Sequence, residues 1–333
     1  MRDFQSEYLR YKAIIDRRLR SLAEEGNRKP QSLLLPLRYV LSGGGKRIRP
    51  ILLLLAYGAV SRKRATAKKF NGALDAALAI EALHNFTLVH DDIMDNAPSR
   101  RGRATVHSKW DESTAILVGD ELVALAYRSL LKTTSVRLRE ILQVFTDGLV
   151  EVCEGQGFDK EFESRRDVTL KEYLKMIEKK TARMVAVTLE IGALIGNGTR
   201  AEINTLRKYG YHLGRAFQIQ DDLLDVTGDK RFGKKIGGDI VEGKKTFLLL
   251  EALRTAERED RQVLERVMDG RGVRRGAVNS VKRIYEKYGA VESARREVRS
   301  HVANAKRALR HLRPSMAREM LDWLAEMLQE RRF

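Results

Sequence analysis

The sequence is poor in proline and in cysteine. Only five prolines occur in 333 residues, and none lies between Pro98 and Pro314. Because proline interrupts helices, this stretch permits long unbroken ones. The single cysteine, Cys153, excludes an internal disulfide and fits a reducing compartment. Strand-like alternation is scarce as well, while Leu, Ala, Glu, Lys and Arg dominate, so we predict an all-α chain.

Long apolar runs are also missing. The longest, ILLLLAYGAV at residues 51–60, is much shorter than the roughly 20 residues that a membrane-spanning helix needs. The first residues, MRDFQSEYLRYK, are charged and lack the apolar core of a signal peptide. Apolar residues still make up 43% of the chain, enough for a sizeable core. We therefore expect a soluble, cytoplasmic protein without stable membrane insertion.

Acidic residues are outnumbered, with 45 against 63 Lys and Arg, which gives a net charge of +18. Such a balance fits nucleic acid, an anionic membrane surface, anionic substrates, or a solvated surface like that of many heat-stable proteins. The basic residues are scattered among acidic ones, and no zinc-finger spacing or strand-rich RNA-binding pattern appears. We therefore expect no nucleic-acid partner, although a basic helical protein that binds nucleic acid or membranes remains an alternative.

Hydrophobic periodicity predicts helices separated by three distinctive loops. The loops are glycine-rich (42–50), arginine-rich (96–111) and rich in glycine and lysine (227–246). The expected helices cover residues 4–25, 33–41, 51–60, 67–95, 111–131, 136–158, 169–196 with Thr169 as N-cap, 200–227, and shorter segments within 247–331. No repeat or low-complexity linker is present, so one domain over 1–333 is expected.

Two helix ends carry clusters of aspartates. In HDDIMD, Asp91 and Asp95 are four residues apart, which puts them about 40° apart on one helix face, and Asp92 flanks them. The repulsion between these carboxylates is costly unless cations lie between them. The same spacing recurs in QDDLLD at Asp221, Asp222 and Asp225. One copy is typical of a solvated helix end, but two copies that each end an apolar helix indicate a site.

Clustered carboxylates suit Mg²⁺, which takes a few of them together with phosphate oxygens, whereas no Cys/His set for zinc is present. The loop GGGKRIRP offers backbone N–H groups with Lys46, Arg47 and Arg49, but it is not a Walker A loop. Other basic residues follow the two aspartate clusters or lie near them: Arg100, Arg101, Lys180, Lys235 and Lys244. Singly each predicts only a surface charge, but together they predict a pocket for a metal-bound diphosphate.

Five motifs in order resemble the trans-type isoprenyl diphosphate synthases, the short-chain polyprenyl synthase family. They are GGGKRIRP, HDDIMDNAPSRRG, EKKTARM, FQIQDDLLD and GGDIVEGKKT, which span roughly residues 40–250. The resemblance implies an isoprenoid-synthase-type helical bundle around a large central cavity, usually a homodimer. It also implies a Mg²⁺-dependent prenyltransferase of isoprenoid and lipid biosynthesis. Such an enzyme condenses isopentenyl diphosphate head-to-tail with dimethylallyl, geranyl or farnesyl diphosphate.

The resemblance also implies roles for individual residues. Three Mg²⁺ on Asp91, Asp95 and Asp221 would hold the allylic diphosphate. The supporting residues implied for that group are Asp92, Asp222, Asp225, Arg100, Lys180, Lys235 (or its neighbour Lys234) and Lys244. Isopentenyl diphosphate would bind without metal, through Lys46, Arg49, His84 and Arg101, with His90 as the rival to His84. Gln218 either touches the allylic carbons or packs between helices.

The product length is predicted from the residues before the first aspartate motif. Phe86 and Thr87, five and four residues before it, would form the floor of the pocket for the growing tail. Phe86 lies about 7.5 Å deeper along the helix axis. The compact D-D-x-x-D spacing resembles archaeal geranylgeranyl synthases and predicts a C20 product. If the floor lies instead at Leu83, or at Leu117 and Val118, a C25 product is the natural alternative, and C15 is a third.

Two other kinds of protein are disfavoured by the same residues. A terpene cyclase would carry Asn, Ser or Thr with Glu in its second metal motif, but QDDLLD has three aspartates. A non-catalytic partner subunit of a heteromeric synthase commonly lacks aspartates, and none is missing here.

Overall fold

The computed structural model describes residues 3–24, 30–62, 67–228 and 237–330. Helices dominate these residues, and their strands form one two-stranded hairpin, so the predicted all-α class is confirmed. Contacts divide the chain into two compact units. Unit 1 comprises Met1–Val144, Thr188–Asn204 and Leu312–Trp323, and unit 2 comprises Phe145–Val187, Thr205–His311 and Leu324–Phe333. The prediction of a single domain stays a prediction, as does that of a central cavity.

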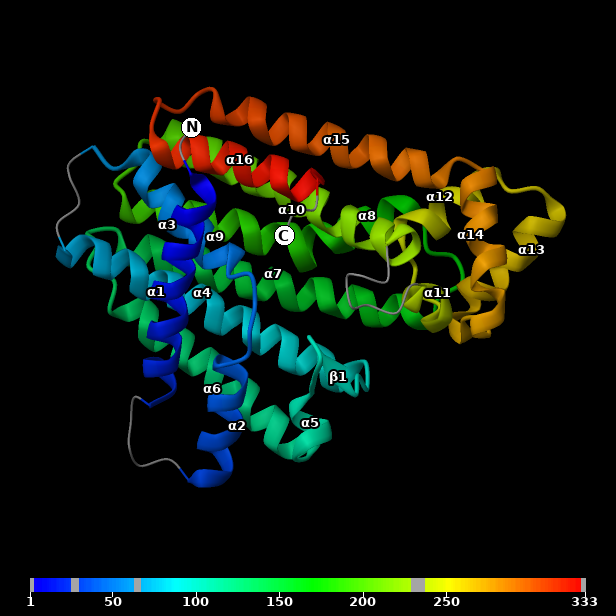
Figure 1. The fold of residues 1–333 in the computed structure, drawn as a ribbon, viewed down its shortest axis with the longest axis horizontal. Helices are drawn as coiled ribbons and strands as arrows, with labels where there is room; N and C mark the ends of the chain where they lie inside the picture. The colour runs from blue at the N-terminus through cyan, green and yellow to red at the C-terminus, as the bar shows by residue number, and fades with distance from the viewer. Residues whose placement is uncertain (1–2, 25–29, 63–66, 229–236, 331–333) are drawn as a thin grey trace. The chain divides into compact units, whose positions relative to one another are not determined.

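Unit 1 is built around two neighbouring helices, α4 (Ala67–Met94) and α6 (Glu112–Leu131). Figure 1 shows these two side by side, with α1 (Phe4–Glu24) crossing them. Helix α2 (Gln31–Leu41) packs on α6, and α3 (Ile48–Val60) packs on α4. Between α4 and α6 the chain forms the hairpin β1 (Ser99–Arg100) and β2 (Arg103–Ala104), followed by the short helix α5 (Val106–Lys109).

The longest apolar run of the sequence forms the interior helix α3. Nine of the ten residues of this run, Ile51–Val60, are buried, and Gly58 is half-buried. The run is therefore apolar because it lies in the protein interior, although it is too short to cross a membrane. The helix begins at Ile48, three residues earlier than predicted, because Pro50 fits the first helical turn, where an N–H is not needed. Arg49 therefore lies on a helix rather than in the glycine-rich loop.

Four of the described helices contribute residues to both units, and the other helices not yet named lie in unit 2. The shared helices are α7 (Leu138–Ser164), α9 (Arg183–Ile195), α10 (Arg200–Thr227) and α16 (Met316–Glu330). The others are α8 (Leu170–Ile177), the π-helix η1 (Glu178–Ala182), α11 (Gly238–Glu242), α12 (Phe247–Thr255), α13 (Arg258–Arg266), the π-helix η3 (Val267–Arg271), the 3₁₀ turn η4 (Arg275–Ala277), α14 (Val278–Lys287) and α15 (Ala290–Leu309). Figure 1 shows α12, α13 and α14 gathered at one end of α15.

The structure confirms Thr169 as an N-cap and differs from the prediction in one helix and two loops. The Thr169 hydroxyl accepts from the N–H of Glu172, whose carboxylate accepts from the N–H of Thr169 in return. The predicted helix 169–196 is interrupted by η1. The predicted loop 96–111 contains the hairpin and α5, and α11 lies in the described part of the predicted loop 227–246. No helix among the described residues is both long and apolar enough to cross a membrane.

Candidate active site

The first aspartate motif ends helix α4, and its three carboxylates differ in burial. Asp92 is buried, and one of its oxygens accepts a hydrogen bond from Nε of Arg100 at 2.6 Å. Burial raises the pKa of Asp92, and the Arg100 guanidinium opposes this shift. Asp91 is half-buried and Asp95 is exposed. The middle carboxylate is therefore held by an arginine, while the outer two are more open to solvent.

The two arginines of this motif are presented by the β1–β2 hairpin. Its turn residues, Arg101 and Gly102, have φ values of 53° and 73°. Left-handed backbone at both positions produces the tight turn that suits a two-residue hairpin. The guanidinium of Arg101 donates from Nη1 to the carbonyl oxygen of Gly44 at 2.6 Å. The hairpin is thus tied to the glycine-rich loop, a connection that the sequence did not reveal.

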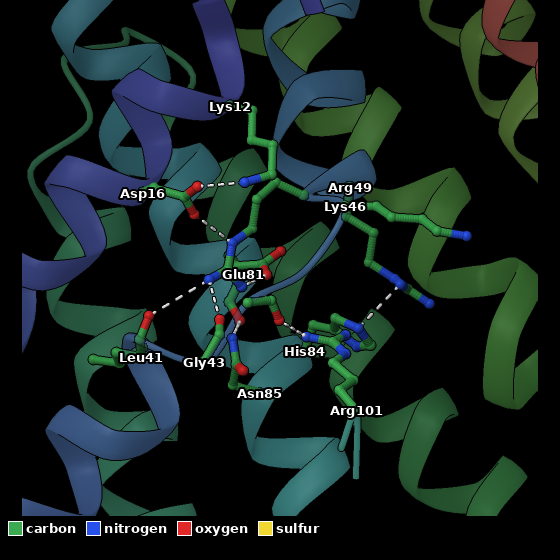
Figure 2. Close-up of polar contacts among 12 residues, drawn as sticks. Lys12, Asp16, Leu41, Gly43, Lys46, Arg49, Glu81, His84, Asn85 and Arg101 are labelled. Atoms are coloured by element: carbon green, nitrogen blue, oxygen red, sulfur yellow. Dashed lines mark hydrogen bonds and ion pairs between the residues drawn. The ribbon is translucent and has the colours of Figure 1, made fainter. Parts of the chain in front are cut away.

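Arg49 and His84 form a pair between α3 and α4. Nη1 of Arg49 lies 3.2 Å from Nε2 of His84 (Figure 2). Because a guanidinium only donates, Nε2 accepts, and the ring proton is on Nδ1. Burial, with Arg49 and Arg101 nearby, lowers the pKa of His84 well below its usual value, so the ring is neutral at pH 7. Burial also lowers the pKa of Arg49 to about 10, which still leaves it charged.

One donor of Arg49 stays unused. Its Nε is buried and has no hydrogen-bond partner among the described residues. A buried donor without an acceptor is costly, and an anion beside it removes that cost. The structure therefore brings Arg49, His84 and the loop-anchored Arg101 near one another, and diphosphate binding by them stays a prediction. Lys46 is exposed, and its carbonyl accepts from the hydroxyl of Tyr8.

Arg47 behaves differently from the other loop cations. Its guanidinium is buried and is bound by Asp16 and Glu81, so it does not face solvent. Neither carboxylate was predicted to belong near the site. Glu81 carried a signal, because it is a lone acid within the apolar stretch ALAIEAL of α4 and has to find a buried partner.

In unit 2, Asp222 of the second motif is buried, and both of its carboxylate oxygens accept hydrogen bonds. Its Oδ2 accepts from the Tyr173 hydroxyl at 2.6 Å and from the N–H of Phe247 at 3.0 Å, and its Oδ1 accepts from Gln218 at 3.2 Å. Burial raises the pKa of Asp222 to about 6, against the lowering effect of these hydrogen bonds. Asp222 therefore fixes α10 against α8 and the start of α12, which fits the supporting role expected for it.

Asp225 also has a structural task. Its two carboxylate oxygens accept from the N–H groups of Gly238 and Asp239 at 3.0 and 3.1 Å, at the start of α11. Asp239 was not predicted as a site residue, although GGDIVEGKKT was one of the five motifs. Its pKa is raised well above the usual value by burial and by the nearby Asp225 and Asp222. Asp221 is half-buried.

Lys180 lies on the π-helical segment η1. Its Nζ is 2.6 Å from Asp159 of α7. Glycines of the two adjacent helices make room for this segment, because a Cβ on Gly155 would collide with the backbone of Lys180 and one on Gly214 with that of Ala182. A π-turn changes the direction of its side chains, and such turns are frequent at functional sites. The helical pattern of the sequence gave no sign of this turn.

The other predicted residues of unit 2 have mixed outcomes. Gln218 accepts from Thr181 at 2.9 Å and donates to Asp222 at 3.2 Å, and its contact with the allylic carbons stays a prediction. Lys244 is exposed and lies 3.1 Å from Glu242, whereas Lys245 is buried against the carbonyl of Glu163. Lys235 and its rival Lys234 lie outside the described residues.

The candidate chain-length residues lie on α4, one turn before the aspartates. The ring of Phe86 packs edge-on against that of His90, with centroids 4.7 Å apart. The Thr87 hydroxyl donates to the carbonyl of His84 at 2.8 Å, within its own helix. Of the rival floor residues, Leu83 and Val118 are fully buried and Leu117 is 57% exposed.

The carboxylates fit Mg²⁺ better than a metal held by protein alone. Among the described residues, no three His, Cys, Asp or Glu side chains converge closely enough to hold a metal ion. Mg²⁺ commonly binds to one or two carboxylates, and water and substrate phosphates complete its shell. Asp91, Asp95 and Asp221 are more exposed than the buried Asp92 and Asp222, which fits the prediction that they bind the metal.

An all-α chain with two aspartate-ended helices and a half-buried Arg–His pair has the features expected of an isoprenyl diphosphate synthase, which is a prenyltransferase. The chain belongs to the polyprenyl synthetase family, whose model, described as "Polyprenyl synthetase", matches residues 30–288.

Relatives agree with this assignment. The chain is 40% identical over 324 residues to a short chain isoprenyl diphosphate synthase of Methanothermobacter thermautotrophicus, with 97% of each chain covered. It is 36% identical over 318 residues to a geranylfarnesyl diphosphate synthase of Natronomonas pharaonis, with 92% of each covered. The crystal structure of geranylgeranyl pyrophosphate synthetase from Pyrococcus horikoshii has a TM-score of 0.91 at 33% identity, with 99% of each chain covered. The predicted isoprenoid-synthase-type fold is confirmed.

Proposed function

We propose that the protein condenses isopentenyl diphosphate with allylic diphosphates and that its main product is geranylgeranyl diphosphate. The observation that carries the proposal is the cluster formed by Arg49, His84 and Arg101. It combines a half-buried guanidinium, whose buried Nε is an unused donor, with a neutral histidine that retains a donor at Nδ1. A diphosphate supplies acceptors for both groups without a metal ion.

We further propose that Asp91, Asp95 and Asp221 hold three Mg²⁺ against the allylic diphosphate. When bound, Mg²⁺ neutralises charge that develops on the leaving diphosphate. Asp92, Asp222 and Asp225 hold the surrounding backbone in place through the hydrogen bonds described above. The other cations assigned to this diphosphate are Arg100, Lys180, Lys244 and, outside the described residues, Lys235.

The reaction follows from this charge distribution. Cations around the allylic diphosphate favour ionisation of its C–O bond, which gives an allylic cation. The double bond of isopentenyl diphosphate, held by Lys46, Arg49, His84 and Arg101, attacks that cation. The new cation then loses a proton to the departing diphosphate, so no side-chain base is required. Apolar walls exclude water, which would otherwise capture the cation.

We also propose that the protein acts as a homodimer in the cytoplasm. Three large apolar side chains of α6 are exposed in the single chain: Ile116 at 43%, Leu117 at 57% and Leu131 at 58%. A second copy would cover them. Light scattering during size-exclusion chromatography measures the mass, and a monomer at micromolar concentration would contradict this part of the proposal.

The test of the proposed reaction is transfer of radiolabelled isopentenyl diphosphate by the purified chain. Dimethylallyl, geranyl and farnesyl diphosphate serve as starters, with and without Mg²⁺, and the dephosphorylated products are sized by chromatography. We expect label in C20 alcohols from all three starters and none without Mg²⁺. Absence of transfer from every starter would refute the proposed reaction, while a main product of C25 or C15 would refute only the chain length.

A further inference from the structure

Arg47 is the centre of a buried network that joins α1, α4 and the glycine-rich loop. Its Nε donates to Asp16 of α1 at 2.8 Å, and its Nη1 donates to Glu81 of α4 at 2.6 Å. Its Nη2 donates to the carbonyl of Gly43 at 2.5 Å. Figure 2 shows Asp16, Glu81 and Gly43 converging on this one group of bonds. The side chains of Arg47 and Glu81 are 2% and 3% exposed, so both charges are almost entirely removed from water.

The same residue carries an unfavourable backbone conformation. Arg47 has φ 53° and ψ 32°, a left-handed position directly before the first residue of α3. A residue with a side chain adopts this conformation only where its surroundings enforce it. The bonds to Asp16, Glu81 and Gly43 supply that enforcement, so the turn that separates Lys46 from Arg49 depends on them.

The network also balances charge beneath the proposed diphosphate site. Glu81 lies one helical turn before His84 on α4, and its carbonyl accepts from the amide of Asn85 at 2.7 Å. A lone carboxylate at this position would repel a diphosphate. Arg47 neutralises it, and Asp16 is in turn paired with Lys12 at 2.6 Å. The charges in this network alternate in sign and cancel, in the order Lys12, Asp16, Arg47 and Glu81. The positive charges of Lys46, Arg49 and Arg101 are therefore left for the ligand.

We propose that Arg47, Asp16 and Glu81 are positioning residues for isopentenyl diphosphate, and that α1 thereby contributes to the affinity for this substrate. The network acts through the loop: it fixes the left-handed turn at Arg47 and so holds Lys46 and Arg49 where the diphosphate binds. This inference rests on the proposed function. Its rival is a network that only stabilises the packing of α1 on α4.

The chain offers a matched control for that rival. Arg18 of α1 and Asp75 of α4 form an ion pair at 2.9 Å, in which Asp75 is 14% exposed. This pair joins the same two helices but makes no contact with the glycine-rich loop in the interactions described here. Asp75→Asn therefore weakens the packing of α1 on α4 and leaves the turn at Arg47 intact.

The experiment compares Asp16→Asn, Glu81→Gln and Asp75→Asn by steady-state kinetics. Hydrogen bonds to charged groups change affinity by roughly 10- to 100-fold. We expect Asp16→Asn and Glu81→Gln to raise the KM for isopentenyl diphosphate by about that factor, with the KM for farnesyl diphosphate within about twofold of wild type. Asp75→Asn should leave both KM values unchanged. Thermal melts monitored by circular dichroism show whether each variant is folded.

Binding of isopentenyl diphosphate alone, measured by calorimetry, gives a second readout that does not require turnover. Arg47→Lys keeps the charge but reaches fewer acceptors, and we expect it to weaken this binding as Asp16→Asn does. Unchanged binding in folded Asp16→Asn and Arg47→Lys overturns the inference, as does equal weakening by Asp75→Asn. If Glu81→Gln fails to fold, the other two variants still decide. A wild-type chain that transfers no isoprenyl group would instead overturn the proposed function.

Discussion

The ring of His90 occupies the space that a side chain at position 119 would need, so that position is Gly119. A Cβ placed on Gly119 of α6 would overlap Nε2 of His90 on α4. The ring also lies with Nε2 3.4 Å from the carbonyl of Ile116 and packs against Phe86. His90 was considered as a diphosphate contact from the sequence, but in the structure it supports the residue proposed to limit product length.

Phe86→Ala should lengthen the products by at least one C5 unit. Removal of the ring opens space beneath the first aspartate motif and leaves His90 without its aromatic partner. The products made from farnesyl diphosphate, sized after dephosphorylation, measure the shift. An unchanged product spectrum from a folded variant would place the floor elsewhere, with Leu83 and Val118 as the buried candidates.

Gly119→Ala tests the support of that floor. The new methyl group displaces the His90 ring, and Phe86 loses an edge-on aromatic contact worth about 0.5–1.5 kcal/mol. We expect a broader product distribution than in wild type. Gly157→Ala is the control, since a Cβ at that position meets nothing within 4 Å. If both variants give the wild-type distribution, His90 has no influence on product length.

Replacement of the open aspartates should abolish turnover without unfolding. Asp91→Ala or Asp221→Ala should lower kcat by roughly 10³-fold or more, because each removes a Mg²⁺ ligand whose effect is greatest in the ionising transition state. Asp120→Ala, at an exposed position of α6, is the control. Activity within about tenfold of wild type in either variant would disprove the metal assignment, since loss of a ligand costs more than that. Thermal melts with and without Mg²⁺ and inorganic pyrophosphate measure how far these ligands stabilise each variant, which gives a readout besides activity.

Much of the fold was accessible from the sequence because helix formation is local. The absence of proline from 99–313 and the apolar periodicity gave the main helices, and Thr169 as an N-cap gave one helix start. The π-turn at Lys180 was not accessible, because it depends on close approach permitted by Gly155 and Gly214, which are remote in sequence. The hairpin at Arg101 was missed because no alternation marks strands of two residues.

The two aspartate motifs of the site could be predicted because the same spacing of charged residues occurs twice. The partners of the buried charged residues could not be predicted. The two aspartate motifs were recognised by their spacing. Which aspartate is buried in each could not be read from that spacing, because it depends on partners such as Tyr173 and Arg100. Likewise Arg47 resembled the other loop cations in the sequence, and only the packing of α1 and α4 shows that its charge is consumed by Asp16 and Glu81.

The two substrates should respond to different variants. Arg49→Ala or His84→Ala should raise the KM for isopentenyl diphosphate by ~10-fold or more, with a smaller effect on the allylic substrate, because each removes a donor to one diphosphate. Lys180→Ala should do the reverse. Lys179→Ala is the matched control, since Lys179 lies on the same π-turn but pairs with Glu154. Equal effects on both substrates would show that these residues were assigned to the wrong sites.

The stability of the protein should fall in mild acid through a histidine pair in unit 2. Nδ1 of His212 on α10 lies 3.0 Å from Nδ1 of His301 on α15. Burial, with Arg215 and His212 nearby, lowers the pKa of His301 from 6.5 to about 4, and burial also lowers that of His212. Lys208 adds positive charge, and Glu297 lies 3.8 Å from Nε2 of His301.

The direction in which the free energy of unfolding changes with pH follows from the difference in protons bound by the folded and the unfolded chain. Above pH 6.5 His301 is neutral in both the folded and the unfolded chain, so its contribution to stability is complete. Between pH 6.5 and 4 the unfolded chain takes up a proton that the folded chain does not, which lowers the free energy of unfolding by up to roughly 1.4 kcal/mol per pH unit. His301→Asn should make the free energy of unfolding less dependent on pH in this range, and His311→Asn, at an exposed position, should not. Urea denaturation at pH 4.5, 5.5 and 7 measures the slopes, and equal slopes for wild type and His301→Asn would show that His301 does not carry the acid sensitivity.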